Sequence, residues 1–438
     1  MTHPPTRRDF LKAGALFAAA AAAPGALARR AFAATGGGAG NKTLVSIFLR
    51  GGADPLNVFV PYGDDDYHAA RPTLAMTEED GLVPLDDVFA LHPALASWKE
   101  LWDEGLLAPV VCAGSPHPTR SHFDAQDWME FAAPGDRTVR QGWLNRYLTA
   151  TATADASEFR ALAMQELLPR SLRGDYPVLA VPQNLDRRRA GKTLDLFDDF
   201  YGDGSDLMEG PSMAGPRDDD DTGVVESGRM TIETLRRFQE IVGKGDRGGR
   251  RSARERRRDR ERTVAESASA FPNSRFGRRM EMIAKVIQAD AGLEVVGLDY
   301  GGWDDHTNEG ATDGRMADRL GDLGPAIAAF CRALGPRMER TTIVLMSEFG
   351  RTVRENGNDG TDHGHGGAMV VIGGGVRGGR IHGDWRGLAS SALYQGRDLP
   401  VTTDFRDVQA AVLENVLGFD LPKGFFPGYK PRPVAKLF

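Results

Sequence analysis

The sequence has only two cysteines among its 438 residues. Cys112 lies in the apolar run Val110–Ala113, and Cys331 follows the apolar run Ala328–Phe330. Apolar surroundings of this kind are typical of buried thiols. A disulfide framework and a cysteine-rich metal site are therefore excluded.

The N-terminus lacks an apolar run long enough to cross a membrane. Its uncharged stretch from Ala13 to Ala23 is rich in alanine, whereas a spanning helix needs about 20 strongly apolar residues to cross roughly 30 Å of hydrocarbon. The preceding segment, Thr6–Lys12, contains paired arginines followed by Phe10 and Leu11, which is typical of a twin-arginine export signal. We therefore expect residues 1–33 to be a signal peptide that is cleaved after export.

This signal predicts the compartment and one partner. The twin-arginine machinery carries folded proteins across the cytoplasmic membrane, so we expect the mature chain to be periplasmic, attached to the cell wall or secreted, without a stable membrane anchor. Export after folding suits a chain that acquires a metal or cofactor before it crosses the membrane.

The mature chain has no excess of positive charge. Removal of residues 1–33 takes away five basic residues and one acidic residue, so the formal net charge changes from −7 to −11. A chain this acidic is a poor general binder of nucleic acid. The basic run Arg250–Arg262 is opposed by the acidic run Asp218–Asp221. Opposed charge blocks favour a solvated loop over a nucleic-acid surface.

The segment 202–268 also has few large apolar residues outside a short expected helix, Ile232–Val242. A segment of this composition buries too little apolar surface to offset the entropy lost on ordering. We therefore expect a partly disordered insertion in a single domain that spans residues 41–438.

Apolar runs alternate with amphipathic segments along the rest of the chain. The runs that predict strands are 44–49, 109–113, 294–298, 342–346 and 368–372, and the segments that predict helices are 94–107, 280–289 and 323–334. This alternation predicts an α/β domain with a mostly parallel central sheet and helices on both faces. In such sheets, sites form beyond the carboxyl ends of the strands.

Polar residues gather next to these predicted strands. The stretch Thr361–Gly367 holds two histidines and one aspartate among glycines, a pattern that indicates a metal site at a strand edge. A second group, Trp303–His306, contains another carboxylate and imidazole pair. The candidate metal ligands are Asp54, Asp304, His306, Glu348, Asp362, His363 and His365.

Some of these residues have simpler interpretations. Ser121 with Asp124 matches a helix capping box, Glu348 stands at ion-pair spacing from Arg351, and Asp54 precedes Pro55 as at the start of a turn. Asp304 could likewise cap a following helix. Two closely spaced histidines among glycines have no comparable role in core packing, so the sequence favours metal binding most strongly for His363 and His365.

These polar blocks, together with Asp404–Val408, resemble the exported bacterial family known as domain of unknown function 1501. That family is in turn distantly similar to the alkaline phosphatase and sulfatase superfamily, whose members use a mostly parallel sheet, two metal ions and a serine, threonine or cysteine nucleophile. The resemblance implies Asp54 as the first ligand and Ser121 as the nucleophile. Phe349 stands where the superfamily has a histidine ligand.

The resemblance implies a metal-dependent hydrolase of phosphate or sulfate esters with a small anionic substrate. Zinc is the first expectation for the divalent metal, with calcium, magnesium or manganese as alternatives. Metal ions could activate Ser121 or a water molecule. Substrate contacts are expected from Arg120, His122, Asn57 and Arg351. The alternatives are a deacetylase or amidase with the same ligands, and a non-catalytic exported binding or scaffold protein with a degraded site.

Overall fold

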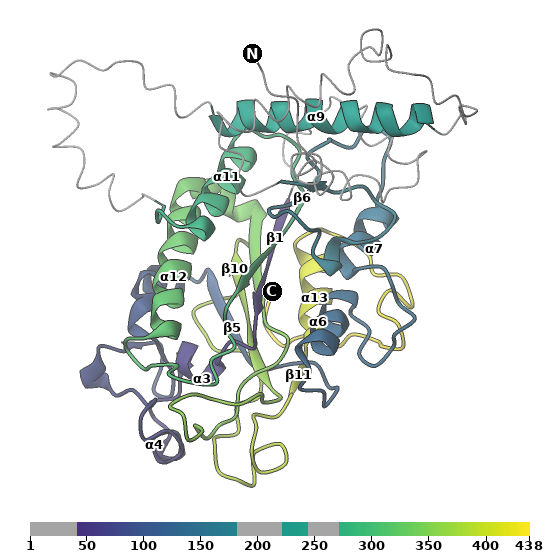
Figure 1. Ribbon diagram of the computed structural model, residues 1–438. Coiled ribbons are helices and arrows are strands. Elements are labelled where there is room, and N and C mark those ends of the chain that lie inside the picture. Colours follow the sequence, from purple (N-terminus) through teal and green to yellow (C-terminus); the bar gives the residue numbers. More distant parts are fainter. Residues whose placement is uncertain (1–41, 182–220, 244–270) are drawn as a thin grey trace, which may run out of the picture.

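The computed structural model describes residues 42–181, 221–243 and 271–438 (Figure 1). The expected signal peptide, and most of the insertion expected at 202–268, lie outside the described residues. The centre of the molecule is an eight-stranded sheet with the order β11-β5-β10-β9-β1-β8-β6-β7. Its strands are β1 (Thr43–Arg50), β5 (Leu107–Gly114), β6 (Ala161–Ala163), β7 (Leu179–Ala180), β8 (Val295–Gly301), β9 (Thr341–Met346), β10 (Gly367–Gly373) and β11 (Thr403–Asp404).

The sheet confirms the expected α/β class with mostly parallel strands. Strand β1 pairs in parallel with β8 and β9, whereas β10 is antiparallel to both β9 and β5. Strand β1 is buried from Thr43 to Leu49, and β5 is buried along its whole length. Strands covered on both faces read as continuous apolar runs, which is why the sequence revealed them.

Helices cover both faces of the sheet (Figure 1). One face carries α11 (Arg275–Gln288), α12 (Arg315–Leu334), the 3-10 helix η2 (Pro93–Trp98) and α5 (Lys99–Asp103). The other carries α6 (His122–Phe131), α7 (Trp143–Ala150) and α13 (Phe405–Asn415). Each layer forms its own apolar core against the strands between them.

Short elements complete the described part of the chain. They are α3 (Pro55–Val58), β2 (Phe59–Val60), α4 (Asp65–Ala70), η1 (Glu78–Asp80), β3 (Val83–Pro84), β4 (Ala90–Leu91), η3 (Arg170–Leu172) and η5 (Gly335–Arg340). Strands β2, β4 and β3 form a separate small sheet. Among the described residues, no helix has both the length and the apolar character that crossing a membrane requires.

One helix prediction was wrong in its extent. The segment 94–107 was expected to form a single helix, but it contains all of η2 except Pro93, then α5, and finally the first residue of β5. Gly105 adopts a positive φ of 71°, which ends the helical stretch and lets the chain turn into the strand.

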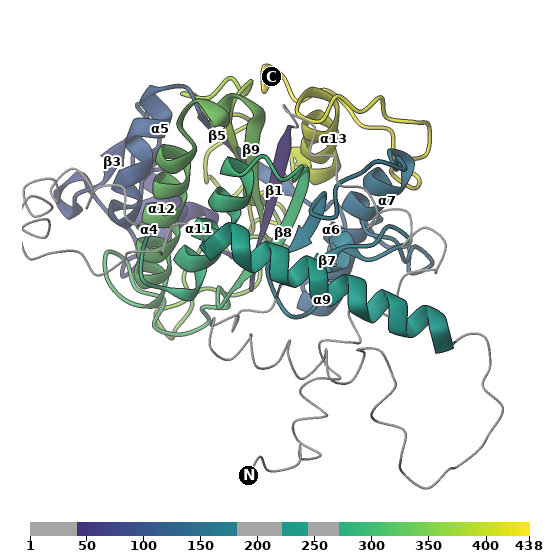
Figure 2. The same ribbon diagram turned by 90° about the horizontal axis from the view of Figure 1, so that it is seen from above.

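The described part of the insertion is more ordered than expected. Helix α9 (Asp221–Gly243) is longer than the predicted 232–242 segment. Figure 2 shows it crossing the outside of the domain. Leu235 and Phe238 are nonetheless buried in the same core as Phe276, and the Phe238 ring lies 6.4 Å from that of Phe159. This helix therefore contributes apolar area to the core.

We predict that Phe238→Ala lowers the free energy of unfolding by about 3–5 kcal/mol, because it removes a fully buried aromatic ring. Glu233→Ala on the exposed side of the same helix is the control, with an expected change within about 0.5 kcal/mol. Denaturant unfolding of the mature protein measures both values. Equal free energies of unfolding for Phe238→Ala and the parent protein would show that α9 does not contribute to the core.

Candidate metal centre

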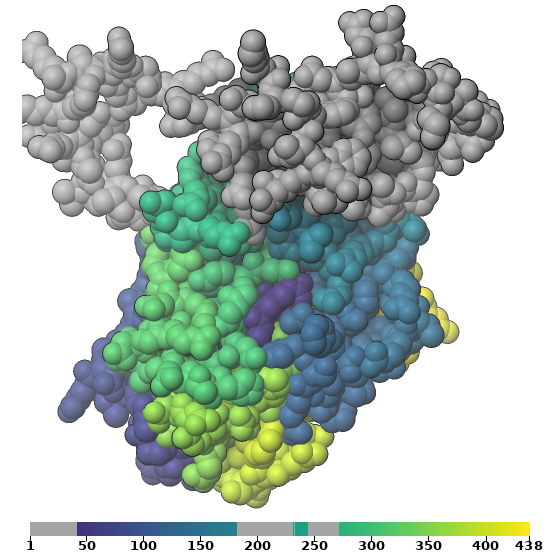
Figure 3. Space-filling model, in the orientation of Figure 1, coloured from purple at the N-terminus to yellow at the C-terminus, as the bar shows by residue number. Residues whose placement is uncertain are grey.

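Five chain segments meet at one edge of the sheet. Strands β1, β5, β8 and β9 all end there, and β10 begins there because it runs in the opposite direction. This explains how the stretch 361–366 reaches the site although it precedes its strand. The blue segment that contains α6 and the green and yellow-green segments after residue 300 adjoin on one face of the molecule (Figure 3).

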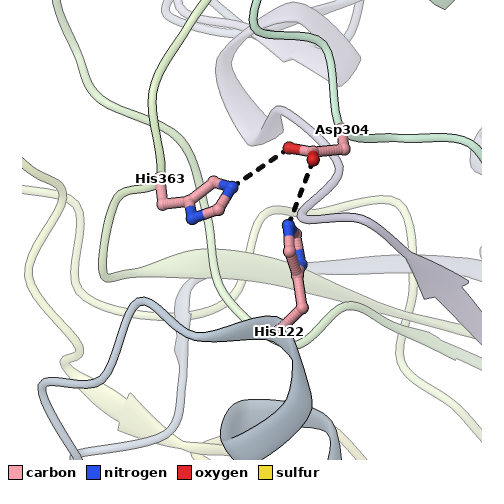
Figure 4. A group of neighbouring side chains, drawn as sticks. All are labelled: His122, Asp304 and His363. Carbon is pink, nitrogen blue, oxygen red and sulfur yellow. Dashed lines mark hydrogen bonds and ion pairs between the residues drawn. The ribbon is translucent and has the colours of Figure 1, made fainter.

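His122, Asp304 and His363 converge at this edge, and one potential ligand atom from each lies within 4.8 Å of the others (Figure 4). His363 Nε2 is 3.0 Å from one carboxylate oxygen of Asp304, and His122 Nε2 is 3.3 Å from the other. His306 lies beside this trio, with its Nε2 atom 3.0 Å from Asp304 Oδ1 and 2.9 Å from His363 Nε2. The structure thus brings together three ligands expected from the sequence and His122, which was expected to contact substrate.

A buried carboxylate orients the His122 ring. The Nδ1 atom of His122 lies 2.8 Å from Glu348 Oε1. The same carboxylate oxygen accepts hydrogen bonds from Gln126 Nε2 and from the Gly51 amide. Burial would raise the pKa of Glu348, but the hydrogen bonds from His122 and Gln126 lower it below its ordinary value. Glu348 is therefore an acceptor for the Nδ1 proton, and His122 Nε2 faces Asp304 in the cluster.

The other two imidazoles are held in the same way. His363 Nδ1 lies 2.8 Å from the carbonyl oxygen of Arg120, and His306 Nδ1 lies 3.1 Å from Asp362 Oδ1. Burial would raise the pKa of Asp362, but its hydrogen bonds, first from His306, lower it. All three rings thus have an oxygen acceptor at Nδ1 and direct Nε2 towards Asp304. An acceptor on the outer nitrogen is the usual support of a metal-bound histidine.

Asp304 is held by a guanidinium group. Arg351 Nη2 donates to Asp304 Oδ1 over 2.7 Å. Burial would raise the pKa of Asp304, but hydrogen bonds from Arg351 and His363 lower it to about 2. Asp304 is consequently a carboxylate at neutral pH. Arg351 is fully buried, and its other donors bind the carbonyl oxygens of Gly51, Gly52, Trp303 and Thr361.

The spacing of these atoms fits a metal ion. Ligands on a tetrahedral ion with bonds of about 2.0–2.1 Å lie about 3.3 Å apart. His306 Nε2 and His363 Nε2 each lie 3.0 Å from Asp304 Oδ1, and His122 Nε2 lies 3.3 Å from Asp304 Oδ2. Imidazole nitrogens with a carboxylate group suit zinc and other first-row divalent ions.

Phe349 forms an apolar wall of the cluster. Its ring centroid lies 4.9 Å from that of His122 and 4.8 Å from that of His363. The residue is buried, and it packs against the two imidazoles at a position where a histidine ligand was expected from the resemblance. The ring thus restricts how both imidazoles can tilt.

Asp54 does not join the cluster. It caps α3 and forms a buried ion pair with Arg71, which is also buried. Asn57, expected to contact substrate, instead accepts a hydrogen bond from Arg71 and is fully buried. Glu309 lies against this group and accepts a 2.7 Å hydrogen bond from Thr361 Oγ1. Asp54, Arg71, Asn57 and Glu309 thus form a buried polar group that stabilises the loops of the site.

Three further candidates have other surroundings. His365 stacks on Tyr394 with ring centroids 4.2 Å apart, outside the trio. Ser121 is the N-cap residue of α6, but its hydroxyl is exposed and makes no hydrogen bond with the described part of the chain. The Arg120 side chain pairs with Asp398 over 2.6 Å.

The sequence analysis did not identify His122 as a potential ligand or Arg71 as the partner of Asp54. A useful signal for His122 was its place as the first residue of a helix that follows a strand end, next to the proposed nucleophile. Nothing in the local sequence around Arg71 indicates a pairing with Asp54, because the contact depends on the fold of the loops after β1.

Comparisons with known proteins confirm the resemblance to the domain of unknown function 1501 family. The family model described as "Protein of unknown function (DUF1501)" matches residues 92–420. The chain belongs to this family. A twin-arginine translocation signal matches residues 4–24, so this DUF1501 protein is exported across the cytoplasmic membrane by the twin-arginine route. A search of curated proteins found no match.

We predict that Glu309→Gln makes folding less sensitive to pH. Burial, and then the neighbouring Asp54, raise the pKa of Glu309 well above its ordinary value. The folded state thus holds a proton that the unfolded state releases above roughly pH 4.3, so stability from this group falls as pH rises towards the folded-state pKa.

Melting temperatures between pH 5 and 8 measure this effect. Glu309→Gln should show a smaller decline than the parent protein, and the exposed Glu79→Gln should behave like the parent. An unchanged decline in Glu309→Gln would mean that Glu309 is ionised in the folded protein.

Proposed function

We propose that this protein is an exported metal-dependent hydrolase of phosphate or sulfate esters. The observation that carries the proposal is the convergence of three imidazole Nε2 atoms on Asp304, each ring with an oxygen acceptor at Nδ1. A cluster of imidazoles around one carboxylate offers a set of metal ligands. The distant resemblance to phosphatases and sulfatases supports the choice of ester.

In this proposal His122, Asp304 and His363 hold one divalent ion, with His306 at the same position or next to it. A bound ion of this kind lowers the pKa of a coordinated water and polarises an ester oxygen. Glu348 orients His122, and Arg351 keeps Asp304 ionised and in place. Phe349 excludes water from one side of the two imidazoles.

We favour one ion over the pair found in the superfamily. Arg71 engages the carboxylate of Asp54, which was expected to bind the first ion, and Phe349 offers no ligand atom. We also favour water over Ser121 as the nucleophile. No base lies within hydrogen-bonding distance of the Ser121 hydroxyl among the described residues, although an activated serine normally has such a partner.

The same two features, Phe349 and the Asp54–Arg71 pair, favour a second candidate function. An exported metal-binding protein without hydrolytic activity would need the ligands but not the second ion. Metal-loaded protein that hydrolyses no ester would support this alternative.

We predict that mature protein loaded with zinc binds about one ion per chain, as one ligand cluster implies. Asp304→Ala and His363→Ala should lose most of this metal, because each removes a ligand atom. Glu348→Gln should weaken affinity by about 10–100-fold through loss of the acceptor that orients His122.

The matched control is His365→Phe, which removes the other histidine of the same motif but keeps a ring on Tyr394. Elemental analysis after dialysis gives the metal content of each variant. Equal loss of metal in His365→Phe and His363→Ala would refute this ligand assignment.

We predict that Ser121→Ala keeps its activity. With p-nitrophenyl phosphate and p-nitrophenyl sulfate as substrates, its kcat/KM should stay within about twofold of the parent value, because water is the proposed nucleophile. Asp304→Ala should abolish hydrolysis of whichever ester the parent protein cleaves. Abolished hydrolysis in Ser121→Ala, at normal metal content, would instead identify a serine nucleophile.

A further inference from the structure

Two arginines share one buried carboxylate beside the candidate metal centre. Asp398 is fully buried, and it accepts hydrogen bonds from Arg397 Nε over 2.8 Å and from Arg120 Nη2 over 2.6 Å. A third bond joins Arg397 Nη2 to Asp398 over 3.2 Å. Two cations against one anion leave this group with a net charge of +1.

Both arginines also form a hydrogen bond with His363. Arg397 Nη2 donates to the carbonyl oxygen of His363 over 2.6 Å, and the carbonyl oxygen of Arg120 is the acceptor for His363 Nδ1. The guanidinium group of Arg397 and the main chain of Arg120 are therefore held next to one histidine of the cluster, and Asp398 holds the Arg120 side chain beside them. Arg120 and Arg397 remain 34% and 43% exposed, so solutes can reach both side chains.

Their hydrogen-bonding capacity is not used up. Within the described parts of the chain, the Nη1 atoms of Arg120 and Arg397 have no hydrogen-bond partner, and Arg120 Nε is buried without one. A guanidinium group with unused donors binds phosphate or sulfate oxygens well. Arg351, the other arginine expected to bind an anion, is fully buried with all its contacts inside the protein.

The start of α6 adds a helix N-terminus beside Arg120, and the acidic residue of its first turn, Asp124, is paired with Arg137. Arg120 lies just before α6, a helix of ten residues whose first-turn amides receive no side-chain cap from Ser121. Uncapped amides and the helix dipole favour anions at this end. A metal ion at the cluster would contribute in the same direction.

We infer that Arg120 and Arg397, held by Asp398, form the anion-binding element of this site and recognise a phosphate or sulfate group. This inference rests on the proposed function for the neighbouring metal site, and it replaces Arg351 by Arg397 as a substrate contact. Arg120 and Arg397 bind the non-bridging oxygens, and Asp398 prevents the two guanidinium groups from separating.

Binding of inorganic phosphate and of inorganic sulfate to zinc-loaded mature protein tests the inference by calorimetry. Arg120→Gln is the principal variant, because the contact of Arg120 with His363 comes from its main chain and persists. Phosphate or sulfate affinity should fall roughly ten- to hundredfold in Arg120→Gln and in Arg397→Gln, as expected for loss of a charge-assisted contact. Metal content, measured in the same samples, separates anion binding from disturbance of His363.

The matched control is Arg354→Gln, which removes the same charge from an exposed arginine that makes no hydrogen bond with the described residues. Its anion affinity should stay within about twofold of the parent value, because isolated surface charges act weakly. Equal loss in Arg354→Gln and Arg120→Gln, or no binding of either anion by the parent protein, overturns the inference.

Hydrolysis is a separate readout. Anion binding that depends on Arg120, in a protein that cleaves neither ester, upholds the inference and refutes the hydrolase. Ester cleavage with unchanged anion binding in Arg120→Gln and Arg397→Gln upholds the hydrolase and refutes the inference.

Discussion

One buried guanidinium group ties the segments of the site together. Arg351 binds carbonyl oxygens after β1, after β8 and before β10, and it also binds Asp304. A fully buried cation needs this many partners, because an unpaired charge in the interior costs several kcal/mol. The hydrogen bonds of Arg351 therefore hold three loops from distant parts of the sequence in one arrangement. Asp304 belongs to that arrangement and reaches the cluster already oriented.

A second buried guanidinium group, that of Arg71, also stabilises the loops of the site. Arg71 joins Asp54 to the carbonyl oxygens of Thr352 and Val353, which lie just after Arg351 in the sequence. The aspartate expected to bind metal is thus part of the scaffold that holds the loops of the candidate site. A carboxylate at this position is compatible with either role, and the pairing with Arg71 decides between them.

The fold was largely predictable, and the site only in part. The apolar run 342–346 coincides with β9 to within one residue because a strand buried on both faces leaves a strong local pattern. Asp304, His306 and His363 were accessible to sequence reasoning because carboxylates and imidazoles beside strands are distinctive. The Arg71–Asp54 pair depends on contacts between loops remote in sequence, and such contacts leave no local periodicity. The antiparallel direction of β10 was equally hidden, since an apolar run looks the same in either direction.

The register of strand β10 sets the position of the candidate metal centre. The strand is hydrogen-bonded on both sides, to β5 and to β9, with its register to β5 shifted between Gly367 and Ala368. A slip of one residue would move the preceding loop by about 3.4 Å, more than the length of a metal–ligand bond of about 2.0–2.3 Å. It would also turn the side chains of Val370 and Val371 to the wrong faces. The pairing of this apolar strand thereby fixes where the loop that carries His363 begins.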